Sequence, residues 1–168
     1  MPAPRTAPEQ PGPGQESVWD YPRPPRIDRS DELVEVVLGG RAVARTREAL
    51  RVLETSHPPT YYLPASAFEE GVLQPVPGTT HCEWKGRASY FDLVSPDGPT
   101  AERAAWTYAD PVRGFESLRD HVAVMPAAVD ECRVDGETVR PQEGRFYGGW
   151  ITSRVVGPFK GGPGTWGW

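Results

Sequence analysis

Residues 33–46, LVEVVLGGRAVART, decide the fold class of this chain because they predict a β-hairpin. The apolar side chains at positions 34, 36 and 38 share one face, as in a strand that buries one side. The double glycine Gly39-Gly40 separates this strand from a second one over residues 41–46. A type I′ turn needs positive φ at both central positions, which glycine adopts without steric cost. The stretch therefore predicts two antiparallel strands joined by a tight turn.

Short strands are also expected on both sides of this hairpin. Turn signals at Ser95-Pro96-Asp97-Gly98 and Asp135-Gly136 separate neighbouring strands. Residues 48–54 fit either a helical turn or a short strand, and residues 64–70 fit a single helical turn. The other strand candidates are residues 61–63, 73–76, 81–94, 103–108, 122–125, 129–134, 137–139 and 145–156. Strands this short indicate an all-β fold, a barrel or folded sheet with one or two short helical turns.

Composition and charge limit the partners that we expect. The 168 residues suit one domain, and 38% of them are hydrophobic. The net charge of −5 argues against a nucleic-acid partner, since such proteins usually carry a basic surface. No run of 18 apolar residues predicts a transmembrane helix, and the N-terminal residues lack the apolar core of a signal peptide. We therefore expect a cytoplasmic protein without a membrane partner, and its oligomeric state stays open.

The chain divides into three parts by composition. Eight of the 20 prolines fall within residues 1–25, which we expect to form a disordered or extended arm, with Trp19 and Tyr21 as the first anchors on a core. Residues 26–156 are predicted to form a single β domain. Residues 157–168 form a tail rich in glycine and tryptophan. We expect the tail to pack on the domain, because tryptophan favours burial.

The most distinctive segment of the chain is TTHCEWKGRASY at residues 79–90. If it belongs to one strand from residue 81 to 94, Cys82 and Trp84 face the core, and Glu83 and Lys85 face the other way. Lys85 could bind a phosphate or carboxylate, or act as a nucleophile if desolvated. The alternative is a solvated strand face with a cross-strand ion pair. Gly86 is expected to mark a bulge or a close approach of backbone.

Cysteines and histidines give little indication of a cofactor. Cys82 and Cys132 lie 50 residues apart and neither belongs to a CxxC pair. Cys82 is expected to be buried and inert beside Trp84, with a reactive thiol as the alternative. The three histidines lack the spacing of metal ligands. We therefore expect no metal and no other cofactor, and no catalytic residue is assigned.

Aromatic residues spread over several predicted strands fit either a sheet core or the wall of a ligand pocket. The cations expected closest to such a pocket are Lys85 and two arginines. The candidate ligand-binding residues are Lys85, Glu83, Trp84, Arg45, Tyr61, Trp106, Tyr108, Trp150 and Arg154.

The pattern Cys-x-Trp-Lys-Gly-x-Ala-x-Tyr at residues 82–90 resembles that of the bacterial domain-of-unknown-function 427 family. The hairpin at 36–44, Tyr-Tyr-Leu-Pro at 61–64 and Ala-Trp-Thr-Tyr at 105–108 agree with it, so the resemblance covers about residues 34–134. It implies an all-β fold, a compact curved antiparallel sheet or barrel similar to the Mss4-like β-tent group. Several proteins of that group hold zinc between CxxC pairs, which this chain lacks. The family also carries a nucleotidyltransferase-like label, but the chain has no Gly-Ser followed by Asp-x-Asp and no Lys-x-Asp-Gly.

Three hypotheses for the function follow. The first is a binding module in which Lys85 and an arginine orient a small anionic molecule in an aromatic-lined pocket. The second is an enzyme of the transferase type that uses Lys85, Cys82 or Glu83. The third is a protein-interaction module that uses the proline-rich arm and the tail. The observation that separates them best is whether the two lysines of the chain, Lys85 and Lys160, approach a common cavity.

Overall fold

The computed structural model describes residues 7–82, 84–144 and 147–168. Within these residues the chain forms β-strands and four short 3-10 helices, with no α-helix. The elements in chain order are β1 (Glu16–Ser17), η1 (Val18–Asp20), β2 (Arg26–Arg29), β3 (Val34–Leu38), β4 (Arg41–Thr46), β5 (Leu50–Leu53), β6 (Thr60–Pro64), η2 (Ala65–Ala67), β7 (Leu73–Cys82), β8 (Gly86–Val94), β9 (Thr100–Thr107), η3 (Glu116–Leu118), β10 (His121–Val124), η4 (Pro126–Ala128), β11 (Glu131–Val134), β12 (Glu137–Thr138), β13 (Arg140–Pro141), β14 (Trp150–Ile151) and β15 (Val155–Val156).

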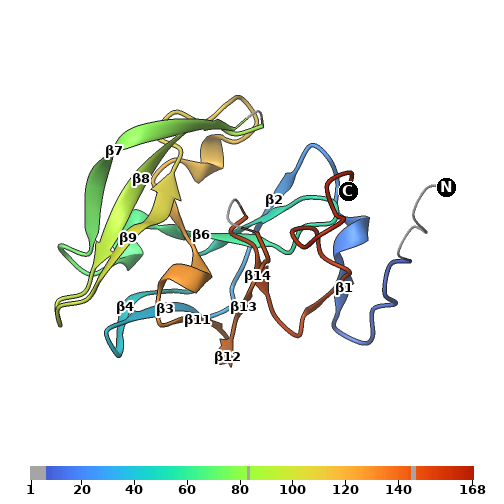
Figure 1. The fold of residues 1–168 in the computed structure, drawn as a ribbon, viewed down its shortest axis with the longest axis horizontal. Helices are drawn as coiled ribbons and strands as arrows, with labels where there is room; N and C mark the ends of the chain where they lie inside the picture. Colours follow the sequence, from blue (N-terminus) through green and yellow to red (C-terminus); the bar gives the residue numbers. More distant parts are fainter. Residues whose placement is uncertain (1–6, 83, 145–146) are drawn as a thin grey trace.

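Two antiparallel sheets make up most of the fold (Figure 1). A seven-stranded sheet has the order β2-β5-β6-β10-β9-β8-β7, and a four-stranded sheet has the order β12-β11-β3-β4. The large sheet ends at β2 and β7, so it is open and not a barrel. Bulges in β7 and between β8 and β9 shift the register, and bulges bend strands and increase their twist. The expected all-β fold with a curved antiparallel sheet is confirmed.

The main core lies between the two sheets. Val34 and Val36 of β3 pack with Leu63 of β6 and Val122 of β10, all of them at most 1% exposed. Successive side chains of a strand point to opposite faces. Tyr62 of β6 therefore belongs to a second apolar cluster, on the other face of the large sheet. That second face is where the cavity described below lies.

The hairpin and turns that glycine predicts are present. Gly39 and Gly40 both have positive φ, of 69° and 72°, between β3 and β4. Asp135 and Gly136, with φ of 49° and 82°, join β11 to β12 in the same way. The ambiguous residues 48–54 contain the strand β5. These turns could be predicted because the preference of glycine and aspartate for positive φ depends on the residue itself and not on distant contacts.

Two predicted strands are wrong in extent. Residues 81–94 do not form one strand, because β7 ends at Cys82, β8 begins at Gly86, and Trp84 and Lys85 lie in the turn between them. Gly86 has a φ of 112°, which side-chain-bearing residues rarely adopt. The expected alternation of side chains between the two faces of one strand is therefore wrong for Trp84 and Lys85. In the predicted strand 145–156, only β14 and β15 form, and residues 145–146 lie outside the described part.

The proline-rich segment contacts the rest of the chain, first through hydrogen bonds between Glu9 and Gly157 and then through β1. Glu16–Ser17 pairs in parallel with β15, and Val18 is fully buried. The Glu16 carboxylate accepts a hydrogen bond of 2.8 Å from Arg51, whose side chain is only 2% exposed. An apolar side chain and one well-placed carboxylate thus fix a segment whose proline content alone predicts disorder.

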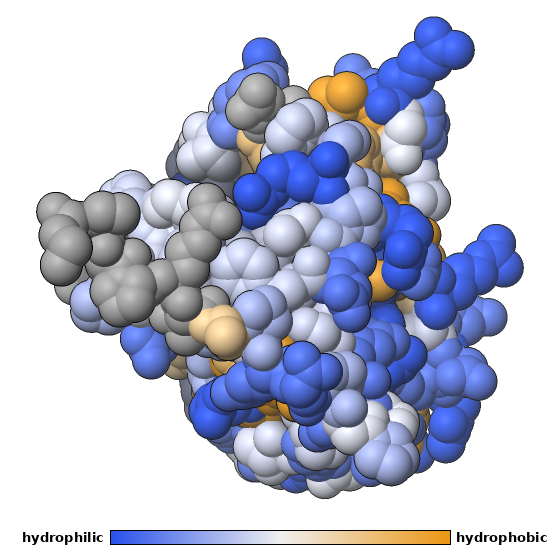
Figure 2. Space-filling view, turned by 90° about the vertical axis from the view of Figure 1, so that its right-hand side faces the viewer, coloured by the Kyte–Doolittle hydropathy of each residue, from blue (hydrophilic) through white to orange (hydrophobic). Residues whose placement is uncertain are grey.

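The tail lies along this N-terminal segment at one end of the molecule (Figure 1). The Trp19 indole Nε1 donates to the Pro158 carbonyl oxygen at 2.9 Å, and the Trp19 and Trp168 rings meet edge to face at 5.3 Å. Trp166, in contrast, is 89% exposed. Figure 2 views this end and shows hydrophobic residues only in small patches between hydrophilic ones. No helix of the described residues is long and apolar enough to span a bilayer.

Candidate functional site

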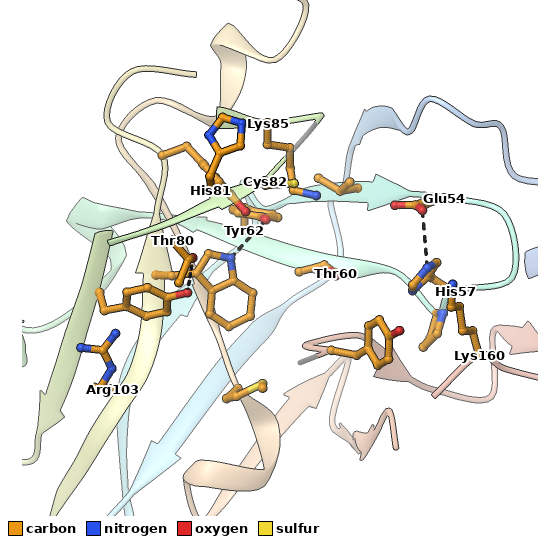
Figure 3. Close-up of a pocket in the computed structure, with 17 residues that line it drawn as sticks. Glu54, His57, Thr60, Tyr62, Thr80, His81, Cys82, Lys85, Arg103 and Lys160 are labelled. Carbon is orange, nitrogen blue, oxygen red and sulfur yellow. Dashed lines mark hydrogen bonds and ion pairs between the residues drawn. The ribbon is translucent and has the colours of Figure 1, made fainter. Parts of the chain in front are cut away.

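A cavity of about 640 Å³ opens on the second face of the large sheet. Its size falls within the range of about 300–1,000 Å³ that is typical of small-molecule sites. Strands β5 to β9, the turn before β8 and the C-terminal segment, defined as residues 136–168, all contribute to it (Figure 3). The lining residues that the following paragraphs use are Glu54, His57, Tyr62, Thr80, Cys82, Lys85, Tyr90, Arg103, Trp106, Tyr108, Tyr147 and Lys160.

Aromatic side chains form one wall of the cavity. The Trp106 indole Nε1 donates to the Tyr62 hydroxyl at 3.4 Å, and the Tyr62 and Tyr108 ring centroids lie 6.4 Å apart. Burial is the main cause that raises the pKa of both tyrosines above their usual 10. Their hydroxyls are therefore neutral at physiological pH. This wall offers ring faces for a flat or apolar part of a ligand.

Lys85 projects from the turn between β7 and β8 and lies in the upper part of Figure 3. Its ammonium nitrogen lies 6.0 Å from the Tyr108 ring centroid, within cation–π range. Its carbonyl oxygen accepts a 2.9 Å hydrogen bond from the Val112 amide. Next to it, a Cβ at Gly86 would lie 3.3 Å from the Asp110 carbonyl oxygen. The close approach expected at Gly86 is thus present, and it fixes the backbone that carries Lys85.

Lys160 reaches the cavity from the tail, on the same side as His57 (Figure 3). Its amide donates to the Ser56 carbonyl oxygen at 2.8 Å, and its own carbonyl accepts from the Gln142 side chain at 2.7 Å. Its ammonium nitrogen donates to the Trp168 carbonyl oxygen at 2.9 Å. An ammonium has three donors, so two remain for a bound molecule. Both lysines of the chain therefore line one cavity.

His57 joins the tail to the cavity through Gln142. The Gly149 amide donates to Gln142 Oε1 at 3.1 Å, so Gln142 Nε2 is the donor that lies 3.2 Å from His57 Nδ1. The imidazole proton is then on Nε2, 3.5 Å from a Glu54 carboxylate oxygen. Burial, followed by the positive charges of Lys160, Arg23 and Lys85, lowers the pKa of His57 from 6.5 to about 4. His57 is therefore neutral at pH 7, and its contact with Glu54 is not an ion pair.

Arg103 lies at the opposite end of the cavity (Figure 3). It occupies the bulge of β9 with a φ of 47°, an uncommon value for a residue with a side chain. Its guanidinium carbon lies 4.4 Å from the Tyr90 ring centroid, and one of its nitrogens donates to the Pro77 carbonyl oxygen at 2.9 Å. The Tyr90 hydroxyl in turn shares a 2.6 Å hydrogen bond with Thr80. The bulge thus turns the guanidinium over the aromatic wall.

The lining carries more positive than negative charge, although the whole chain has a net charge of −5. Lys85, Lys160 and Arg103 contribute three cations. Among the described lining residues, Glu54 is the one carboxylate, and it already pairs with Arg23 at 3.4 Å. A cavity with such a local excess attracts anions.

Three of the candidate ligand-binding residues line this cavity, namely Lys85, Trp106 and Tyr108. Trp84 is half-buried and packs against the apolar cluster behind the cavity. Glu83 lies outside the described residues.

The remaining four candidates lie away from the cavity. Tyr61 and Trp150 stack at 5.0 Å in the main core, each at most 1% exposed. Arg154 pairs with Glu16 and Glu32 near the N-terminal segment. Arg45 is exposed on β4, in the smaller sheet. Alternation along β6 places Tyr61 in the main core and its neighbour Tyr62 in the cavity wall.

Sequence reasoning missed Glu54, His57, Tyr62 and Arg103 as part of one site. Glu54 and His57 lie in the loop after β5, Tyr62 lies in β6 and Arg103 lies in β9, and no local motif joins all four. The sequence signal that could have indicated part of this site is the position of His57 directly before Pro58-Pro59. Two prolines restrict the backbone there and so limit the positions of the His57 side chain.

Of the two free cysteines, Cys82 is half-buried and lines the cavity, whereas Cys132 is buried in the main core. Burial raises the pKa of the Cys132 thiol, which makes it a poor nucleophile. Within the described ranges, no group of three His, Cys, Asp or Glu side chains is placed to hold a metal ion.

Fold and cavity together define a class: an open all-β domain with a cationic, aromatic-walled cavity that a C-terminal segment completes. The family model described as "Domain of unknown function (DUF427)" matches residues 26–135, more than half of the chain. The chain belongs to this family. No curated protein matches the chain.

Proposed function

We propose that this protein binds a small anionic molecule in the cavity on the second face of the large sheet. The observation that carries the proposal is the convergence of Lys85 and Lys160, the two lysines of the chain, on one cavity. Both lysine residues are partly buried, and a charge pair in such a site is screened less by water than one on the open surface.

The aromatic wall supports the same proposal. Trp106 and Tyr108 present ring area beside the lysines, so a ligand can combine anionic groups with a flat apolar part. Burial is the main cause of the lowered pKa of His57, and the charges of Lys160, Arg23 and Lys85 add to it. The positive potential therefore extends through this end of the cavity.

Calorimetric titration and thermal unfolding with a panel of small anions test this proposal. A ligand present at 100 times its Kd adds about 2.7 kcal/mol of stability, which corresponds to a Tm increase of roughly 5–10 °C for a chain of this size. Sodium chloride at equal ionic strength controls for general salt effects.

Lys85→Gln is expected to weaken the binding of these anions about tenfold or more, because it removes one charged donor. Arg45→Gln is the matched control, since it removes one positive charge from an exposed position outside the cavity. Equal losses in both variants, or no anion that shifts the Tm of the wild-type chain, would overturn the proposal.

The transferase hypothesis places Cys82 or Lys85 against the same bound molecule. It predicts that the small molecule is consumed, which mass spectrometry of the titrated solution would detect.

We also propose a cytoplasmic location, which is supported by the two free thiols, since reducing compartments keep cysteines unpaired.

A further inference from the structure

The cavity is built from two parts of the chain. Most of its lining lies between Val52 and Met125, within the residues that the family model matches. Tyr147 and Lys160, however, lie beyond residue 135 and belong to the C-terminal segment. One of the two lysines is therefore supplied from outside the matched domain.

The C-terminal segment is held against the domain by specific contacts. Gln142 is 6% exposed, and its side-chain amide joins Gly149 and Lys160 within the segment and lies 3.2 Å from His57 Nδ1 of the domain. The Lys160 amide also donates to the Ser56 carbonyl oxygen of the domain at 2.8 Å. A Cβ at Gly149 would overlap Gln142 and Pro58. The segment fits here because the buried Gln142 amide bonds within it and because Gly149 has no side chain. Both features indicate a defined position for Lys160.

The two ammonium groups enter the cavity from different elements. Lys85 comes from the turn after β7, beside Cys82, and Lys160 comes from the tail beside His57 (Figure 3). A ligand with a single anionic group that contacts one of them leaves the other without a contact to the ligand. A ligand with two separated anionic groups satisfies both.

We infer that the C-terminal segment is a specificity element, in which Lys160 makes this cavity select molecules with two separated carboxylate or phosphate groups. The inference rests on the proposed function and adds the ligand class. Lys85 then binds one anionic group and Lys160 binds the other.

Isothermal titration of the full chain with matched probes tests the inference. Benzoate against terephthalate compares one carboxylate with two on the same ring, and phosphate against tripolyphosphate makes the corresponding comparison for phosphates. The wild-type chain is expected to prefer the longer anion of at least one pair by about tenfold or more. The pair that shows the preference identifies the chemical group.

Lys160→Gln is expected to reduce this preference to about threefold or less and to leave binding of the single-group probe within about twofold. Glutamine keeps a donor for the Trp168 carbonyl oxygen, and the backbone hydrogen bonds of Lys160 remain. Arg140→Gln is the matched control, because it removes one charge from an exposed position of the same segment. A circular dichroism melt of each variant verifies that it is folded.

The two proposals fail in different ways. If no probe binds the wild-type chain, the proposed function is wrong and the inference falls with it. If the probes bind but the wild-type chain shows no preference, or Lys160→Gln keeps it, the inference is wrong and the proposed function stands. If Lys160→Gln weakens both probes of a pair equally, Lys160 is a general anion contact and not a specificity element.

Discussion

Acidification is expected to destabilise this protein between pH 6.5 and 4.5 mainly through His57. The His57 side chain is only 16% exposed. Burial, and then the charges of Lys160, Arg23 and Lys85, lower its pKa from 6.5 to about 4. The nearest carboxylate, on Glu54 at 3.5 Å, does not offset these effects. Protonation is therefore easier in the unfolded chain than in the folded one.

The size of the effect follows from this difference in pKa. Between pH 6.5 and 4 the unfolded chain takes up a proton at His57 and the folded chain does not, so stability falls with pH. Each pKa unit corresponds to about 1.4 kcal/mol, which places the total loss at about 3 kcal/mol. This is a large part of the roughly 5–15 kcal/mol that stabilises a typical domain. Above pH 6.5 the contribution is fully present.

Urea unfolding at pH 7.0, 6.0, 5.0 and 4.5 measures the loss, with His57→Gln as the comparison. Glutamine keeps hydrogen-bonding groups but does not titrate. The two other histidines are present in both chains, so the difference between the chains isolates His57. Between pH 7.0 and 4.5, the wild-type chain is expected to lose about 2 kcal/mol more than the variant.

Two results would refute the reasoning about His57. Stability curves that run parallel, within about 0.5 kcal/mol, would show that His57 does not titrate differently in the two states. A direct NMR titration that places the pKa of His57 in the folded chain near 6.5 would do the same. Measurements stay at or above pH 4.5. In more acidic solution the stabilisation contributed by the Glu16 carboxylate, whose pKa is lowered to about 2, is also lost.

Two further substitutions test how the cavity and the N-terminal segment are held. Gly86→Ala is expected to cost about 1–3 kcal/mol in thermal unfolding, because a φ of 112° is strained for alanine; unchanged stability would contradict the close approach there. Glu16→Gln is expected to cost about 3 kcal/mol, because it leaves the buried Arg51 guanidinium without its carboxylate. Glu48→Gln at an exposed site is its control, and an equal effect of both would show that Arg51 needs no partner.

Local chemistry explains which parts of the fold could be predicted from the sequence. Gly39-Gly40 and Asp135-Gly136 adopt positive φ values in tight turns, and the residue types alone indicate such turns. The turn at Trp84 and Lys85 has no such residues at its centre, and its one glycine follows it. The alternating pattern continued through this turn, so a hairpin was interpreted as a single strand.

The candidate site was harder to predict because both faces of its strands are buried. In β6 the three central residues, including Tyr61 and Tyr62, are at most 1% exposed. Alternation says that these two tyrosines face opposite ways, but not which one faces the cavity. The bulge at Arg103 also interrupts the two-residue alternation of side chains along β9. Lys160 and His57 lie close together through the Gln142 side chain, which contacts both, and through the hydrogen bond from the Lys160 amide to Ser56, all of them contacts between residues far apart in the chain.

The charges of the cavity connect its stability with its selectivity. Lys85, Lys160 and Arg103 line one partly enclosed space, and Glu54, the one carboxylate among the described lining residues, is shared with Arg23. Like charges held together without counter-charges cost folding free energy. Burial, and after it the charges of Lys160, Arg23 and Lys85, lower the pKa of His57, so a further positive charge is disfavoured there. A bound anion adds negative charge where Lys160 and Lys85 disfavour protonation of His57, so the two lysines contribute both to the acid sensitivity and to the expected preference for an anionic ligand.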